Sequence, residues 1–247
     1  MTNHKIRIGI GGWDFDEWRG TFYPEGLSKA KQLAYAAAHL TSIEINATYY
    51  GSQKPAAFAN WARTVPDGFQ FAIKASRFAT NRKILAEGAE SVQRFLTQGI
   101  TELGDRLGPI LWQFMATKKF DVEDFAGFLA LLPAAQDGLP LRHALEVRHE
   151  SFLDPVFYAL ARKANAAIVF ADDDEFPCIE EATADFTYAR LQRAVAACPI
   201  GYADAALDGW ATRAQDWATR GDVFAYFISG AKVRNPAAAQ AMIAKLG

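Results

Sequence analysis

The sequence contains few cysteines, and they are not spaced for a metal site or a redox motif. Cys178 and Cys198 are the two cysteines among 247 residues, too few for the disulfide framework of a small secreted domain. A chain of this length buries enough apolar surface to be stable without such crosslinks. We therefore expect both thiols to be reduced, as thiols are in the cytoplasm.

Long apolar runs are also missing. No stretch approaches the roughly 18 to 20 uncharged apolar residues that a membrane helix needs. The N-terminus from Met1 to Arg7 leads into a short apolar alternation and lacks the apolar segment of a signal peptide. The sequence predicts a soluble cytoplasmic protein with no membrane partner.

An excess of charge of one sign is absent as well. Lys and Arg number 26 and Asp and Glu number 28, which gives a formal net charge of -2. A chain with this charge balance has no overall positive field to attract a polyanion, which argues against a protein that coats nucleic acid. The 22% charged and 13% aromatic residues are typical of a folded globular chain.

Common cofactor and catalytic motifs are missing too. The segment from Gly9 to Asp14 lacks the third glycine of a dinucleotide fingerprint, and no Gly-Lys-Ser/Thr phosphate loop occurs. There is no H-E-x-x-H motif and no nucleophile elbow. Because the histidines His4, His39, His143 and His149 are scattered, we predict no zinc site and no cofactor.

The sequence does have a repeated alternation of strand-like and helix-like segments. Runs rich in β-branched and aromatic residues are followed by longer segments with helical spacing about eight times. The expected strands are 6–10, 42–46, 69–74, 109–114, 143–148, 167–171, 185–190 and 223–228. The expected helices are 27–40, 55–64, 84–99, 121–132, 155–164, 204–220 and 236–246. In the sixth unit only residues 177–184 could form a helix.

This alternation predicts parallel strands joined by helical crossovers. Eight units in 247 residues, roughly 31 residues each, fit a TIM-type (β/α)8 barrel, an α/β fold in a single domain over residues 1–247. An open doubly wound sheet with fewer strands is the alternative. In a barrel, the working residues lie at the C-terminal ends of the strands.

Polar side chains occupy the ends of six consecutive expected strands. Because side chains alternate along a strand, Glu44 and Asn46 share one face of the second strand, and Glu146 and Arg148 share one face of the fifth. The other strand ends carry Lys74, Gln113, Asp172 and, in phase with each other, Tyr188 and Arg190.

Two interpretations of these strand ends are open. One is an internal ion-pair network that fills the barrel mouth. The other is a site for an anionic or polyhydroxylated molecule, with Arg148 and Arg190 as clamps. Glu44 or Glu146 would then act as general base, and Lys74 as proton donor, electrostatic stabiliser or imine-forming amine.

The carboxylates at the strand ends are also potential metal ligands. A divalent ion held through oxygen by Glu44, Glu146 and Asp172 is the one metal site that the pattern leaves open.

Aromatic and basic residues follow several expected strands. Trp13 comes directly after two glycines, and Tyr49 and Tyr50 follow the second strand. Such rings either pack beneath the loops or stack on a base or a sugar. Basic residues follow the third, fourth, seventh and eighth strands, namely Arg77, Arg82, Lys83, Lys118, Lys119, Arg193, Lys232 and Arg234. Loops after the last two strands of a barrel often form phosphate sites, and the alternative is a solvated rim.

Seven segments also occur in a recognisable order. They are Gly11-Gly12-Trp13 with Trp18 and residues 22–24, then residues 44–50, 69–74, 108–113, 146–152, 188–191 and 231–234. Together they resemble the family known as domain of unknown function 72, the YecE-like proteins, over nearly the whole chain. The resemblance implies a TIM-type barrel and no particular activity. The residues that keep the family pattern are Glu44, Asn46, Lys74, Gln113, Glu146, Arg148 and Arg190.

The chain departs from that family at three places. Asn81 stands where members often carry His, and Gln192-Arg193 stands where they carry His-Gly. Ile228 and Ser229 stand where members carry a run of Asp and Asn. These altered positions imply either a different ligand or a site that has lost its activity.

Our leading hypothesis is a barrel that binds a small anionic molecule at its mouth, with hydrolase or lyase chemistry as the enzymatic option. The expected catalytic residues are Glu44, Lys74 and Glu146, and the expected ligand contacts are Trp13, Asn46, Gln113, Arg148, Asp172 and Arg190. The alternatives are a protein that binds or processes nucleic acid, with Trp13 and the tyrosines as stacking surfaces, and a non-catalytic scaffold. The sequence predicts no particular oligomeric state.

Overall fold

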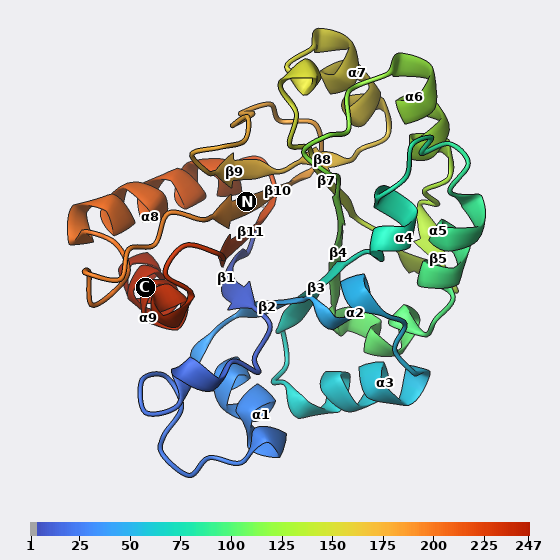
Figure 1. Ribbon diagram of the computed structural model, residues 1–247. Coiled ribbons are helices and arrows are strands. Elements are labelled where there is room, and N and C mark those ends of the chain that lie inside the picture. The colour runs from blue at the N-terminus through green and yellow to red at the C-terminus, as the bar shows by residue number, and fades with distance from the viewer. Residues whose placement is uncertain (1–3) are drawn as a thin grey trace.

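The strands of the protein form one parallel sheet that curves into a barrel. In the computed structural model, which describes residues 4–247, the strand order is β8-β7-β4-β3-β2-β1-β11-β10-β9. Figure 1 shows these strands around the centre of the molecule and the helices on the outside. The strands are β1 (Ile6–Gly11), β2 (Ser42–Ile45), β3 (Gln70–Lys74), β4 (Leu107–Gln113), β7 (His143–Glu146), β8 (Ala167–Ile168), β9 (Phe170–Asp172), β10 (Phe186–Leu191) and β11 (Asp222–Phe227).

The barrel is joined through its sixth strand, which is split into β8 and β9. β8 pairs with β7, and β9 pairs with β10. Between the two halves, the Val169 amide donates to the Leu145 carbonyl oxygen at 3.0 Å. The two edges of the sheet therefore meet along one continuous segment, and the predicted eight-unit barrel is confirmed.

Helices cover the outside of the barrel. The α-helices are α1 (Lys29–His39), α2 (Ala47–Tyr50), α3 (Pro55–Thr64), α4 (Arg77–Thr80), α5 (Ala89–Leu96), α6 (Val122–Ala130), α7 (Pro155–Lys163), α8 (Asp204–Ala218) and α9 (Asn235–Leu246). Short 3-10 turns are η1 (Asp16–Trp18), η2 (Ile100–Arg106), η3 (Glu150–Phe152) and η4 (Lys232–Arg234). A small antiparallel hairpin, β5 (Ala135–Gln136) and β6 (Leu139–Pro140), precedes β7. Within the described residues no helix is both long and apolar enough to cross a membrane.

Two expected helices differ from the structure. The expected helix at 84–99 begins only at Ala89, because Leu85 is buried in the preceding loop and the Ala86 amide bonds to Asp124 at 2.8 Å. Residues 177–184 form no helix. There, the Thr183 hydroxyl accepts from the Ile168 amide at 3.0 Å and donates to the Ala166 carbonyl at 2.7 Å. These two bonds hold the segment against β8.

The core has two layers, one inside the barrel and one between the strands and the helices. The inner layer combines small side chains with aromatic ones, as in Ala72, Ala144, Phe224 and Tyr226. The outer layer is larger and rich in phenylalanine, including Phe125, Phe128, Phe152 and Phe157. Alternation along each strand thus sends one set of side chains inward and the other toward the helices.

A charged cluster fills the N-terminal end of the barrel. Asp222 accepts from Arg7 at 3.0 Å and from Arg142 at 3.4 Å, and Arg142 also donates to Gln70 at 2.8 Å. Both guanidiniums lie over the Phe224 ring, with centroid distances of 5.1 Å for Arg7 and 4.7 Å for Arg142. Burial alone would raise the pKa of Asp222, but the Lys5 amide and the two arginines lower it. The carboxylate therefore stays ionised and closes this end.

The close approach of β1 to β2 requires glycine at position 9. A Cβ atom on Gly9 would lie 2.2 Å from the Ser42 carbonyl oxygen. We expect Gly9→Ala to lower the free energy of unfolding by at least about 2 kcal/mol, because the backbone of the neighbouring strand has to move. Chemical denaturation measures this loss.

The matched control is Gly209→Ala in the exposed middle of α8, where a Cβ atom has no neighbour within 4 Å. This substitution should raise stability by roughly 0.5 to 1 kcal/mol. Equal stability of Gly9→Ala and the wild type would contradict the strand spacing described above.

Candidate functional site

The C-terminal end of the barrel is organised by Arg190, which lies at the end of β10. Its guanidinium donates to Glu146 on β7 at 2.7 Å and to both carboxylate oxygens of Glu44 on β2 at 3.3 Å. Burial alone would lower the pKa of Arg190, but the charges of Glu146 and Glu44 outweigh this effect and raise the pKa above its ordinary value. The guanidinium therefore stays charged and links three strands across the barrel interior.

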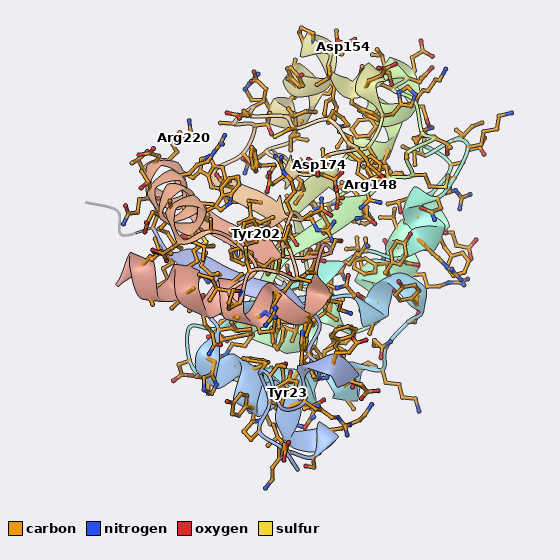
Figure 2. All side chains as sticks on the ribbon, turned by 60° about the vertical axis from the view of Figure 1, so that its left-hand side comes forward. Tyr23, Arg148, Asp154, Asp174, Tyr202 and Arg220 are labelled. Atoms are coloured by element: carbon orange, nitrogen blue, oxygen red, sulfur yellow. The ribbon has the colours of Figure 1, made fainter. Side chains whose placement is uncertain are left out.

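The Glu146 carboxylate has its acceptor positions occupied. Besides Arg190, it accepts from Gln113 at 2.7 Å and from two nitrogens of Arg148 at 3.0 and 2.8 Å. Burial would raise the pKa of Glu146, but Arg190 and Arg148 outweigh this effect and lower the pKa. Glu146 is thus a permanent anion that holds its neighbours in place. Figure 2 labels Arg148 among the side chains of this region.

Glu44 is equally enclosed, with none of its surface exposed. It accepts from the Tyr188 hydroxyl at 2.7 Å as well as from Arg190. Burial, followed by the Glu44 charge, raises the pKa of Tyr188 well above its ordinary value. Tyr188 is therefore a lasting hydrogen-bond donor, and the predicted base Glu44 is held between a phenol and a guanidinium.

Lys74 differs from these residues, because its ammonium group has no acidic partner. Within residues 4–247 its Nζ atom forms no hydrogen bond or ion pair, and it lies 4.2 Å from the centroid of the Tyr49 ring. The residue is 9% exposed. Burial and then repulsion by Arg190 lower the pKa of Lys74 to about 8, with Glu44 and Glu146 opposing the shift. An ammonium group held in this way is ready to gain a partner or to lose its proton.

A cleft of about 560 Å³ opens above this layer. Lys74 and Arg190 face it from the barrel, and Trp13, Asn46 and Lys232 line it from the loops after β1, β2 and β11. Further lining comes from Gly11, Gly12, Asp14, Ile45, Ala47, Tyr50, Ile228, Ser229 and Asn235. The volume lies in the range of small-molecule sites.

The structure thus brings together most of the predicted site residues, at two depths. Lys74, Arg190, Asn46 and Trp13 line the cleft. The remaining predicted residues of the barrel mouth, namely Glu44, Gln113, Glu146 and Arg148, form the hydrogen-bonded layer around Arg190. The ion-pair network of the first interpretation is therefore present beneath the cleft, and the ligand site of the second interpretation stays a prediction.

Asp172 does not join this group. It pairs in register with Leu191, whose side chain belongs to the outer core layer, whereas its predecessor Ala171 pairs with Arg190. The Asp172 carboxylate accepts from Arg193 Nε at 2.7 Å. Glu44, Glu146 and Asp172 accordingly form no shared metal site, and no cluster of three or more His, Cys, Asp or Glu side chains suited to a metal occurs in the described part of the chain.

The aromatic loop residues have separate roles. Trp13 packs on Trp61 and Phe71, at centroid distances of 5.4 and 6.4 Å, so its ring is a wall of the cleft. Tyr49 covers Lys74. Tyr50 and Phe78 are 67% and 61% exposed. The loop aromatics therefore include both packed and solvent-facing rings.

The positions at which the chain departs from the family pattern lie close to the cleft. Asn81 donates to the Tyr49 hydroxyl at 3.4 Å, and Ile228 and Ser229 line the cleft directly. Gln192 is buried, and its Nε2 atom has no hydrogen-bond partner within the described residues. Ile228 and Ser229 are therefore part of the cleft wall, whereas Gln192 lies outside the cleft lining.

Asn235 is a cleft residue that the sequence analysis did not single out. Asn235 is buried at the start of α9, and its side-chain amide donates to the Ser229 carbonyl at 3.2 Å. The signal available in the sequence was the position of Asn235 directly before Pro236, at the expected start of the last helix. That position follows the eighth strand, where barrels often bind phosphate.

The fold and the site define a parallel α/β barrel with a cation-lined cleft at the C-terminal ends of its strands. Residues 7–247 match the family model described as protein of unknown function DUF72. The chain belongs to the DUF72 family, as its resemblance to the YecE-like proteins predicted.

One curated relative is also similar to this chain. UPF0759 protein YunF of Bacillus subtilis (strain 168) is 27% identical over 159 residues, which are 62% of this chain and 54% of that protein. The match thus spans about half the length of that curated relative.

Solved structures show the same fold. A DUF72 family protein from Thermotoga maritima MSB8 has a TM-score of 0.76 at 24% identity, covering 97% of both chains. One from Enterococcus faecalis V583 has a TM-score of 0.75 at 18% identity, covering 98% of this chain and 95% of that one. A xylose isomerase-like TIM barrel/4-hydroxyphenylpyruvate dioxygenase fusion protein gives a TM-score of 0.53 at 15% identity, with 94% of this chain and 41% of that chain covered.

Removing a carboxylate from the ionic layer should destabilise the protein. Glu146→Gln keeps the shape but places an amide NH2 group against the donors that now surround Glu146. We expect a loss of about 3 to 5 kcal/mol, which lowers the melting temperature on the order of 10 °C. The matched control is Glu90→Gln in the exposed Glu90–Arg94 pair, where the change should stay below about 0.5 kcal/mol.

Removing the Lys74 charge should have the opposite effect. The folded-state pKa of about 8 lies below the ordinary value, so the unfolded chain binds more protons between the two values and stability rises with pH through that window. At pH 7 Lys74→Met should therefore stabilise the fold by about 1 to 3 kcal/mol. A loss of stability would show that Lys74 is a structural part of the layer.

Proposed function

We propose that the protein binds a small anionic ligand, bearing a phosphate or a carboxylate, in the cleft above the ionic layer. The observation that carries this proposal is the unpartnered Lys74 at the floor of the cleft. Lys232 adds a second cation, since it forms no ion pair within the described residues and its Nζ atom lies 4.0 Å from the centroid of the Phe15 ring. The acidic lining residue, Asp14, is paired with Lys29 at 2.9 Å. The net charge that faces a ligand is therefore positive.

The contacts also favour one division of chemical roles. Glu44 and Glu146 are saturated by donors and support Arg190 as positioning residues. Lys74 is left as the group that exchanges a proton with a ligand, at a pH close to neutral. Lyase chemistry at Lys74 fits this arrangement better than hydrolysis by a carboxylate base. A cytoplasmic location is part of the proposal, because Cys178 and Cys198 are free thiols.

Anion binding can be tested by titration calorimetry with inorganic phosphate and with pyruvate at pH 7. We expect Lys74→Met and Lys232→Ala each to weaken binding about tenfold, the effect of losing one charge-assisted contact. Because the Lys74 cation disappears as the pH rises through about 8, its contribution should be lost between pH 7 and pH 9.

The control for this titration is Lys119→Ala. Lys119 is exposed in the loop after β4 and does not line the cleft. Equal weakening by Lys119→Ala, or unchanged binding in Lys74→Met, would show that anions bind elsewhere on the surface.

The second candidate function is binding of single-stranded nucleic acid at the rim. The exposed rings of Tyr50 and Phe78 favour it, and the Arg77 guanidinium lies 5.4 Å from the centroid of the Phe78 ring. Other rim cations are less available, because Arg193 pairs with Asp172 and Lys118 pairs with Asp124.

This candidate predicts a steep salt dependence. Affinity for a short oligonucleotide, followed by fluorescence anisotropy, should fall several-fold between 50 and 200 mM salt, about the response expected for a few phosphate contacts. It should also drop when Tyr50 or Phe78 is replaced by Ala. A flat salt response, or equal binding by these variants, would remove the candidate.

A further inference from the structure

We propose that the Lys74 amine forms an imine with an aldehyde or ketone that also carries an anionic group. This inference rests on the proposed anion binding, and it adds a covalent step and a substrate class to it. The substrate class is a small carbonyl compound bearing a carboxylate or a phosphate.

The surroundings of Lys74 separate it from the structural lysines of the chain. Lys118 is similarly enclosed, but it donates to Asp124 at 2.5 Å and to the Lys83 carbonyl at 2.7 Å. Lys245 bonds to Asp204 at 2.8 Å and to Asp208 at 2.6 Å. Lys74 holds no structural element in place through its ammonium group, because the two nearby carboxylates are occupied by arginines and Tyr188. Its Nζ atom is therefore available to a ligand in the cleft.

Burial of Lys74 favours its neutral amine. Burial has the largest effect, Arg190 and Arg148 repel the proton as well, and Glu44 and Glu146 oppose the shift, so that the pKa falls to about 8. At this value roughly a tenth of the lysine is a free amine at pH 7, against less than about a thousandth for an ordinary lysine. Desolvation and an adjacent cation are known ways of activating a lysine as a nucleophile.

The step balances without another reactant. The Nζ lone pair attacks the carbonyl carbon and forms a C–N bond, while the carbonyl oxygen takes up a proton. The resulting hydroxyl leaves as water with a second proton, and a C=N bond replaces it. Starting from the ammonium ion, the products are one protonated imine and one water molecule, so the positive charge stays on nitrogen beside Glu44 and Glu146.

The cleft matches both parts of such a ligand. Lys232 lines it as a partner for the anionic group, and the side chains of Ile228 and Trp13 offer an apolar wall to a short carbon skeleton. Loops after the last strands of a barrel are frequent phosphate sites. The carbonyl would then reach Lys74 at the floor while the anion stays near the rim.

Reductive trapping tests the imine. The full chain is incubated with pyruvate or with dihydroxyacetone phosphate in the presence of sodium cyanoborohydride, and adducts are located by intact mass and peptide mapping. We expect one predominant adduct, on Lys74, whose rate of formation rises with pH to a plateau with a midpoint near 8. Comparing the two probes shows whether a carboxylate or a phosphate is preferred.

Two variants accompany this experiment. Lys74→Arg keeps the cation but cannot form the adduct, and Lys119→Arg at the exposed lysine outside the cleft should react like the wild type. Parallel calorimetry of each probe without the reductant reports anion binding separately. Excess inorganic phosphate should suppress trapping at Lys74 by competing for the cleft.

The outcomes separate the two proposals. Binding of a probe without an adduct on Lys74 overturns the imine and leaves anion binding intact. Adducts scattered over surface lysines, and undiminished in Lys74→Arg, also overturn it. Absence of binding and of adducts for both probes overturns the imine and the anion site together.

Discussion

The ion pairs of Arg190 with Glu44 and Glu146 are the constraint on which the barrel mouth depends. A buried guanidinium is tolerated only when its charge is matched and its donors are used, and here carboxylates from β2 and β7 supply both. Satisfying Arg190 and Arg148 occupies both carboxylates, so Lys74 has none left. The absence of an acidic partner for Lys74 within the described residues therefore follows from the way in which its neighbours are stabilised.

At both ends of the barrel, buried cations lie over an aromatic ring. At the N-terminal end, two arginines share Asp222, and both lie over the Phe224 ring. At the C-terminal end, Lys74 lies over the Tyr49 ring. An aromatic face stabilises a cation only modestly. At the N-terminal end, ion pairs with Asp222 add to this stabilisation. At the mouth, Lys74 has no such ion pair within the described residues and lines the cleft instead.

Much of the fold and part of the site follow from periodicity along single segments. Alternation within β2 and β7 was enough to place Glu44 and Glu146 on the barrel interior, because side-chain direction is a local property of a strand. Which carboxylate meets which arginine was not predictable, since it depends on barrel closure between strands far apart in the chain. The sixth strand shows the same limit. Its break at Val169 arises from pairing with two different neighbours.

Asp172 and the segment 177–184 show where local patterns mislead. Asp172 ends a strand as Lys74 does, yet its register with Leu191 turns it toward the outer layer and Arg193. A helix at 177–184 was compatible with its residues, but the Thr183 hydroxyl fixes the segment to the backbone around β8. In both cases the structure is determined by a contact with another strand, and no periodicity within the segment encodes that contact.

The charged cluster at the N-terminal end has a consequence for molecular exchange. Arg7, Arg142 and Asp222, with Phe186 and Phe224, occupy the barrel axis at that end. Whatever reaches the level of Lys74 must enter through the loops at the opposite end and leave by the same passage. Arrival and departure of any molecule bound at that level are therefore sequential, because a second molecule cannot enter until the first has left.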